Sequence, residues 1–153
     1  MRRFLTQEPR GHSAKHVAVL TSATRPEAVA AALIMNSYGL LNMCGHGMLG
    51  VVTALEELGL IPVTEPVTPL TFETLGGLIV LQIEVSGQTF KNITFRNLAT
   101  FAYRHDIPLD LPGLGHLNVD LLYGGLWFVV VEAAQVGLPL NSATLTDCSG
   151  WVR

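Results

Sequence analysis

The sequence predicts an α+β fold in which a strongly curved, mostly antiparallel sheet wraps around one central apolar helix. Residues 48–60 carry apolar side chains on nearly every face of a helix, which is typical of a helix buried in a core. Many short runs have the β-branched, aromatic or alternating composition of strands. Turn signals separate most of these runs, so the order does not fit the alternating strands and helices of a parallel α/β fold.

The first strand is expected over residues 16–21, where Val17, Val19 and Leu20 supply the apolar side chains. Residues 24–27, Thr-Arg-Pro-Glu, predict a turn or a helix start.

The run over residues 28–35 is ambiguous. Its alanines favour a helix by propensity, but it is short, and the family resemblance described below favours a strand, which we predict. A loop over residues 37–42 then leads to the central helix, predicted over residues 48–58. Its only charged residues, Glu56 and Glu57, stand near its far end, so a buried position for the rest is consistent with the composition.

Strand signals dominate the chain after a linker bounded by Pro62 and Pro66. The expected strands cover residues 70–74, 78–85, 90–96, 100–103, 116–123 and 126–131, with turns at residues 86–87 and 112–115. We expect one domain over residues 1–140. Residues 141–153 are expected to form a tail or the start of a truncated linker helix.

The composition of the 153-residue chain favours a partly covered surface. Hydrophobic residues make up 49% and charged residues only 14%, against about 25% charged in a typical soluble domain. We therefore expect a homo-oligomer or a complementary half-domain to cover part of the chain. The net charge of −3 and the lack of a basic cluster beyond Arg2 and Arg3 argue against a nucleic-acid partner.

The two cysteines, Cys44 and Cys148, do not make a disulfide framework and suit a reducing, cytoplasmic location. The N-terminal residues lack the apolar segment of a signal peptide, and the run over residues 28–35 is too short to span a bilayer. We expect no membrane association.

The pentapeptide over residues 43–47, Met-Cys-Gly-His-Gly, is the most informative motif. It places the thiol of Cys44 and the imidazole of His46 at the start of the apolar helix, where unpaired N–H groups and a partial positive charge favour a thiolate or a bound carboxylate. Gly45 and Gly47 allow a substrate to approach the backbone closely. The alternative is that Cys44 is a small buried hydrophobe and His46 a structural side chain.

No cofactor or metal is expected from the sequence. His16 and His116 lack metal-ligand spacing with each other, so no zinc site is predicted, and no phosphate loop or dinucleotide fingerprint is present.

Several motifs in order resemble the proline racemase family, which contains proline racemases, hydroxyproline epimerases and hydroxyproline dehydratases. These motifs are Glu-Pro-Arg-Gly-His at residues 8–12, Asn-Met-Cys-Gly-His-Gly at residues 42–47, Glu-Pro at residues 65–66, Phe-Arg-Asn at residues 95–97 and Asp-Leu-Leu-Tyr-Gly-Gly at residues 120–125. The resemblance implies the diaminopimelate epimerase-like fold, in which two similar halves face each other across a cleft. The chain is expected to match most of the first half only.

The resemblance implies cofactor-independent removal of the α-proton of proline or a hydroxyproline. Cys44 would be one of two acid/base groups, and Gly45, His46 and Gly47 would bind the substrate carboxylate. The second group would come from the missing half. Departures from the family pattern, such as Ala14, favour an alternative, a non-catalytic truncated remnant or a ligand-binding or self-associating domain that keeps the fold. Half of a hydroxyproline dehydratase is the second alternative.

Other polar residues have structural interpretations. Glu8, Arg10 and His12 are expected to form a buried polar cluster that braces the domain. Asp120 and Tyr123 are expected either to line the cleft or to support the following Gly-Gly turn, and His105 and Asp106 to lie in a solvated turn.

Overall fold

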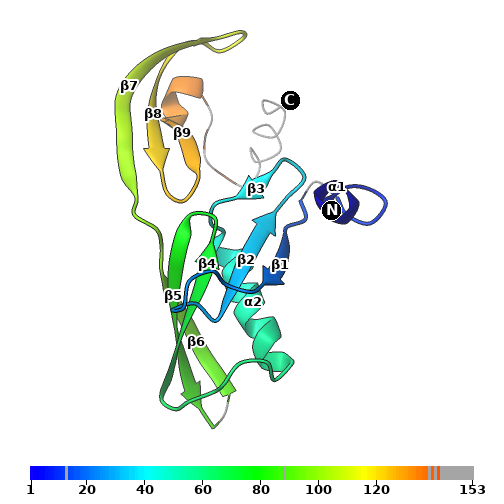
Figure 1. The fold of residues 1–153 in the computed structure, drawn as a ribbon. Coiled ribbons are helices and arrows are strands. Elements are labelled where there is room, and N and C mark those ends of the chain that lie inside the picture. The colour runs from blue at the N-terminus through cyan, green and yellow to red at the C-terminus, as the bar shows by residue number, and fades with distance from the viewer. Residues whose placement is uncertain (13, 88, 138, 140, 142–153) are drawn as a thin grey trace. The chain divides into compact units, whose positions relative to one another are not determined.

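The computed structural model describes residues 1–12, 14–87, 89–137, 139 and 141, and the chain forms two compact units (Figure 1). Unit 1 is Met1–Ala99 and unit 2 is Thr100–Arg153. Each unit has its own β-sheet. The single domain expected over residues 1–140 stays a prediction, and the expected tail, apart from Asn141, lies outside the described residues.

Unit 1 is an α+β unit with a mostly antiparallel sheet, as predicted. Its elements are α1 (Arg2–Thr6), β1 (Val17–Thr21), β2 (Ala30–Met35), β3 (Leu40–Leu41), α2 (Gly45–Glu57), β4 (Val67–Thr74), β5 (Gly77–Ser86) and β6 (Thr89–Arg96). The strand order is β1-β2-β4-β5-β6, with β3 paired to β2. Among the described strands of this sheet, the β2–β4 pair is parallel and the others are antiparallel.

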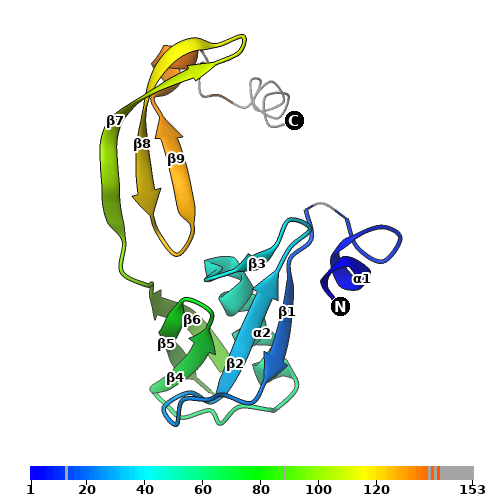
Figure 2. The same ribbon diagram turned by 45° about the horizontal axis from the view of Figure 1, so that its top comes forward.

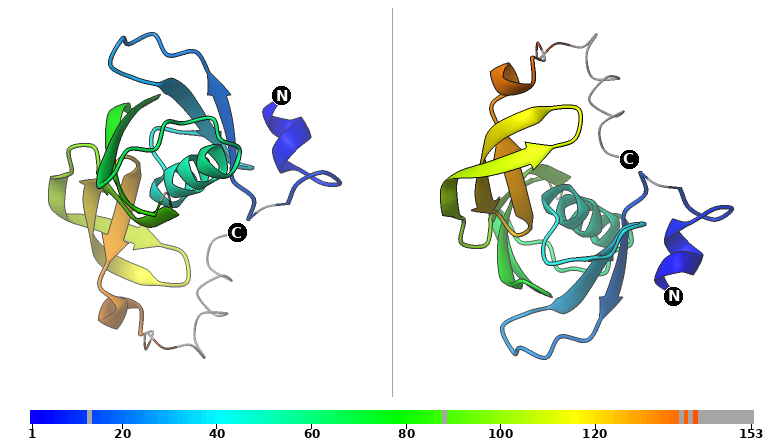
Figure 3. Two further views of the ribbon diagram at one scale, coloured as in Figure 1. Left: turned by 90° about the horizontal axis from the view of Figure 1, so that it is seen from below. Right: turned by 90° about the horizontal axis from the view of Figure 1, so that it is seen from above.

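The core of unit 1 lies between α2 and the inner face of the sheet. Strand β5 alternates between exposed and buried residues along its length, because successive side chains of a strand point to opposite faces. Its inward residues pack with Phe72 of β4, Ile34 of β2, and Met48 and Val52 of α2. In Figure 3, β1 and β2 (blue) and β4 and β5 (green) lie on different sides of α2, so the sheet curves around the helix.

Helix α2 differs from its prediction in two respects. It begins at Gly45 rather than Met48, and it is not buried on every side. Met48, Val51 and Val52 are buried, but Leu58 and Leu60, which follow the last turn, are 69% and 66% exposed. Leu49 and Leu55 are half-buried and Ala54 is exposed, so the sheet curves around the helix without covering all of it.

The N-terminal helix α1 has no clear signal in the sequence. The Arg2 guanidinium holds it to the loop after β2, because Nη1 donates to the carbonyl oxygens of Asn36 and Ser37. Gly11 packs so closely against α1 that a β-carbon there would lie 2.4 Å from the carbonyl carbon of Thr6. The glycine of the motif over residues 8–12 is thus required by packing.

The buried polar cluster expected from Glu8, Arg10 and His12 is wrong, because all three residues are exposed. The Arg10 guanidinium instead lies over the ring of Phe4, 3.8 Å from its centroid, a cation–π contact on the surface.

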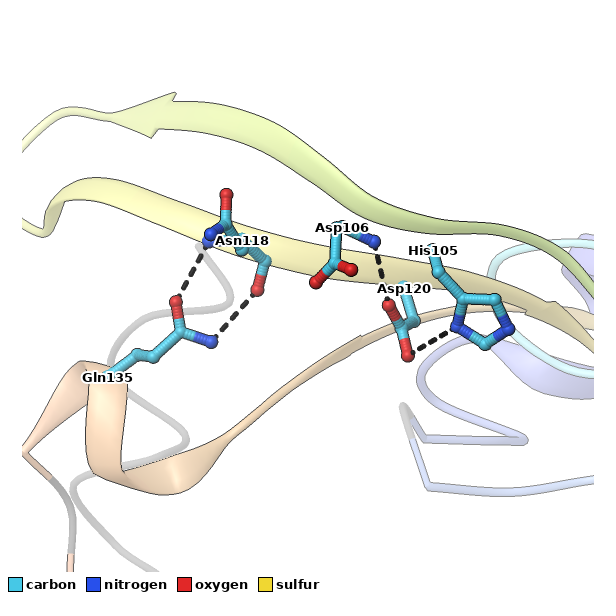
Figure 4. Close-up of polar contacts among 5 residues, drawn as sticks. All are labelled: His105, Asp106, Asn118, Asp120 and Gln135. Carbon is cyan, nitrogen blue, oxygen red and sulfur yellow. Dashed lines mark hydrogen bonds and ion pairs between the residues drawn. The ribbon is translucent and has the colours of Figure 1, made fainter.

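Unit 2 is a three-stranded antiparallel meander (Figure 2). It consists of β7 (Phe101–Leu111), β8 (Gly115–Tyr123), β9 (Trp127–Val131) and the 3₁₀ helix η1 (Ala133–Val136). The side chain of Gln135 ties η1 to β8: it accepts from the Asn118 N–H at 2.8 Å and donates to the Asn118 carbonyl at 2.9 Å (Figure 4).

Within the described part of the chain, we find no helix with the length and apolar character needed to cross a membrane.

Candidate functional site

Cys44 occupies the N-cap of α2. Its backbone is extended, with φ −146° and ψ 107°, and its carbonyl oxygen accepts the first helical hydrogen bond from the Met48 N–H at 2.9 Å. The next three residues, Gly45, His46 and Gly47, form the first turn, where N–H groups lack a partner four residues back. The thiol therefore lies at the positive end of the helix dipole, the local setting that the motif predicted.

His46 lies beside the thiol. Its ring nitrogens Nδ1 and Nε2 are 3.5 and 3.7 Å from Cys44 Sγ. The imidazole is exposed, whereas Cys44 is only 8% exposed. The ring therefore covers one side of the sulfur and is positioned to exchange a proton with it or to share a ligand.

The two glycines of the motif lie at a crowded helix start. A β-carbon at Gly47 would lie 3.2 Å from Cys44 Sγ and 3.3 Å from Cδ1 of the buried Ile34. A β-carbon at Gly45 would lie 2.8 Å from Cζ of Phe95. The absence of a side chain at Gly47 leaves room for the sulfur close to the helix, and its absence at Gly45 leaves room for Phe95.

A second contact holds the segment before the thiol. The Gly76 N–H, in the β4–β5 turn, donates to the Asn42 carbonyl at 2.9 Å. A β-carbon on Gly76 would clash with Leu98 at 2.3 Å and crowd Asn42. The turn between two core strands therefore sets where the chain enters α2.

The structure brings a third side chain, His16, to this site. His16 immediately precedes β1, and its ring packs edge-on against that of His46 with centroids 4.9 Å apart. Ligand atoms of His16, Cys44 and His46 lie within 4.8 Å of one another. The sequence did not predict this cluster, because no local spacing links His16, next to β1, to the start of α2; His16 was weighed as a metal ligand only together with His116.

A hollow of about 460 Å³ runs from this cluster along α2 and β1. His16, His46 and Gly47 line its end nearest the helix start, and the rest of its wall is largely apolar, including Leu20, Val51 and Leu55. Cys44 is not among the lining residues. Cys44 itself is only 8% exposed, and its neighbours His46 and Gly47 form the part of the wall next to the sulfur.

In unit 2, Asp120 supports an irregular segment of β7. Its carboxylate accepts from the Asp106 N–H at 3.1 Å and contacts His105 Nδ1 at 3.0 Å (Figure 4). The hydrogen bond with His105, followed by that with the Asp106 N–H, lowers the pKa of Asp120. Asp106 has a positive φ of 51°, so His105 and Asp106 belong to a bulged strand rather than to the expected turn.

Tyr123 has a different setting from Asp120. It belongs to an aromatic cluster, stacked on Phe101 with centroids 5.3 Å apart and edge-on to Trp127 at 5.2 Å. Tyr123 and Gly124 also line a hollow of about 550 Å³ on unit 2, which Asp120 does not line. The aspartate and the tyrosine of the motif over residues 120–125 therefore have separate local roles.

Comparison with known proteins gives a consistent result. The family model described as proline racemase matches residues 1–152. The chain is 37% identical to a proline racemase from Clostridioides difficile over 156 residues, covering 100% of this chain and 47% of the relative. It is 39% identical to a 4-hydroxyproline 2-epimerase from Streptosporangium roseum over 143 residues, covering 94% of this chain and 43% of that protein.

Solved structures agree. A probable proline racemase from Agrobacterium radiobacter K84, with bound carbonate, superposes with a TM-score of 0.90 at 31% identity, over 96% of this chain and 43% of that chain. A hydroxyproline epimerase from Agrobacterium vitis, with bound trans-4-hydroxy-L-proline, superposes with a TM-score of 0.87 at 29% identity, over 94% of this chain and 42% of that chain. A PhzF-family protein from Bacillus anthracis, at 23% identity and a TM-score of 0.52, shares the fold. The chain spans about half the length of the curated relatives it matches.

Proposed function

The chain belongs to the proline racemase family, and from this premise we propose that Cys44 removes the α-proton of proline or a hydroxyproline without a cofactor. The observation that carries the proposal is the position of the sulfur, at the N-cap of α2 and 3.5 Å from an imidazole nitrogen of His46. The helix start stabilises negative charge on the thiolate.

The first turn of α2 supplies the carboxylate site of this proposal. The N–H groups of Gly45, His46 and Gly47 bind the substrate carboxylate, as helix N-termini bind anions. The Cα–H bond breaks as the Cys44 thiolate takes the proton, and the electron pair left on Cα is delocalised into the bound carboxylate. The same N–H groups stabilise the charge that develops there. The bound trans-4-hydroxy-L-proline of the Agrobacterium vitis epimerase supports an imino acid as substrate class.

Inversion requires a second acid on the opposite face of the α-carbon. One Cys44 cannot reach both faces, and the chain spans about half of its curated relatives. We propose that the second group comes from a partner, either a complementary half-domain or another copy of the chain, and that the chain acts in the cytoplasm.

A non-catalytic protein is the second candidate. The observations that favour it are the 8% exposure of Cys44 and the apolar wall of the adjacent hollow. In that case the helix start would keep a ligand site without proton transfer.

Exchange of the α-proton decides between the two. The chain is incubated in D₂O with L-proline, D-proline or trans-4-hydroxy-L-proline, and deuterium incorporation is followed by NMR. We expect Cys44-dependent exchange that falls about 100-fold or more in Cys44→Ser, since a positioned base contributes about that factor or more. Cys148→Ser is the matched control because it replaces the other cysteine of the chain, and it should exchange like the wild type. Exchange that is absent, or unchanged in Cys44→Ser, would sink the catalytic proposal.

A further inference from the structure

Three metal-ligating side chains from two parts of unit 1 converge at the start of α2. Cys44 and His46 come from the N-cap and first turn of the helix, and His16 comes from the residue before β1. Their ligand atoms lie within 4.8 Å of one another. Two imidazoles and one thiol are typical ligands of Zn²⁺ in proteins.

The distance between Cys44 and His46 already matches that of a tetrahedral zinc site. Zn–S and Zn–N bonds of about 2.3 and 2.05 Å at the tetrahedral angle place S and N about 3.6 Å apart, and two N atoms about 3.3 Å apart. Cys44 Sγ and His46 Nδ1 are already separated by 3.5 Å. The remaining pairs need to close from at most 4.8 Å, and His16 and His46 are both exposed, so burial does not hold either ring in place.

We propose that Cys44, His46 and His16 form a binding site for Zn²⁺, with its fourth coordination position open toward the adjacent hollow. Binding forms one Zn–S and two Zn–N bonds, and a proton leaves the Cys44 thiol for the solvent when the metal enters. The neutral imidazoles bind through a ring nitrogen without losing a proton. Three protein ligands and one open position are typical of zinc sites that remain accessible to a small ligand.

The site has a consequence for the proposed chemistry. A metal-bound sulfur no longer offers its electron pair to a substrate proton, so Zn²⁺ should inhibit α-proton exchange. This consequence rests on the proposed function, whereas metal binding itself does not.

The binding test uses Co²⁺ as a spectroscopic probe and Zn²⁺ as its competitor. The purified chain, with reduced cysteines, is titrated with Co²⁺. We expect one equivalent to give a thiolate-to-Co²⁺ charge-transfer band and the intense visible bands of four-coordinate Co²⁺, and Zn²⁺ to displace it. Cys44→Ser should lose the charge-transfer band.

His16→Gln is the decisive variant, because His16 lies outside the motif. Losing a residue that only orients a ligand costs about 10–100-fold in metal affinity, so His16→Gln should weaken binding at least about tenfold. The matched control is His12→Gln, which changes an exposed histidine of the same unit outside the cluster and should bind like the wild type. His46→Gln should weaken binding as His16→Gln does, and circular dichroism checks that each variant is folded.

The proposal is overturned if wild type shows no charge-transfer band with Co²⁺. It is also overturned if His16→Gln binds Co²⁺ as tightly as the wild type, because His16 would then only pack against the ring of His46. In the activity arm, Zn²⁺ should inhibit exchange with the midpoint found for binding. If the chain shows no exchange at all, the proposed function fails, and the spectroscopic titration still decides the metal site.

Discussion

Gly47 and Gly50 lie about one turn apart on α2, and they respond differently to a methyl group. A β-carbon at Gly50 meets no atom within 4 Å, whereas one at Gly47 meets Cys44 Sγ at 3.2 Å and the buried Ile34 at 3.3 Å. Gly50→Ala should therefore raise the free energy of unfolding by about 0.5–1 kcal/mol, the usual gain from replacing glycine inside a helix.

Gly47→Ala gains the same helix propensity but crowds the sulfur. We expect it to be at least about 1 kcal/mol less stable than Gly50→Ala, within the usual range for an overpacked core. Urea unfolding of the two variants and the wild type measures the difference. Equal stability of the two variants would show that Cys44 and Ile34 can move aside, and that the motif does not hold the sulfur against the helix.

For individual residues, the sequence could predict which side chains lie together only where they are close along the chain. Cys44 and His46 belong to one helix start, so their proximity follows from the helix itself and the motif predicted it. His16 belongs to the site through the packing of β1 and α2 in unit 1, which no spacing in the sequence encodes. The exposed positions of Glu8 and Arg10 were mispredicted for the same reason, since the motif identified the residues but not the surface on which they lie.

The bulge of β7 depends on Asp120 and provides a pH-dependent test at the scale of one element. Hydrogen bonds from His105 and the Asp106 N–H lower the pKa of Asp120 below its ordinary value. The ionised carboxylate therefore stabilises unit 2 above the unfolded pKa of about 3.9. This contribution is lost as the pH falls through the lower folded pKa.

Urea unfolding at pH values between about 6 and 2 should show this loss in wild type. Asp120→Asn should lose the Asp120 contribution to the pH dependence, and His105→Gln should reduce it, because the hydrogen bond from the Asp106 N–H remains. The same dependence on pH in Asp120→Asn and wild type would contradict the assignment.

Strands with regular alternation were predictable, and irregular ones were not. The inward side of β5 follows directly from its period of two. A strand was predicted over residues 100–103, with His105 and Asp106 in a solvated turn, but β7 continues past both residues with a shifted register. Strand β2 is rich in alanine, and its local propensity left open whether it is a helix or a strand. Its pairing with β1 and β4 makes it a strand.

For the whole molecule, exposed apolar residues predict self-association. Leu58 and Leu60 are mostly exposed, and Leu20 on β1 lines the same hollow. We expect the sedimentation coefficient to rise with protein concentration, and Leu58→Glu to reduce the rise by removing apolar surface and adding charge. Thr53→Glu is the matched control, since it adds the same charge to α2 at an exposed polar residue. A strictly monomeric profile for wild type would contradict the expected oligomer.

The stereochemistry of exchange tests how much of the two-base reaction this chain performs. A base on one face of the α-carbon can remove a proton and return a deuteron only to that same face. If Cys44 is the base, as proposed, the chain should therefore deuterate one enantiomer of proline with retention and without inversion. NMR measures deuterium incorporation and chiral chromatography measures inversion in the same sample.

The outcomes of this experiment differ in the number of bases that they require. Exchange without formation of the opposite enantiomer would support one base per chain. A rate of inversion that rises with the square of protein concentration would indicate that two copies pair their sulfurs. A rate of inversion per chain that does not depend on protein concentration would contradict the single-base assignment.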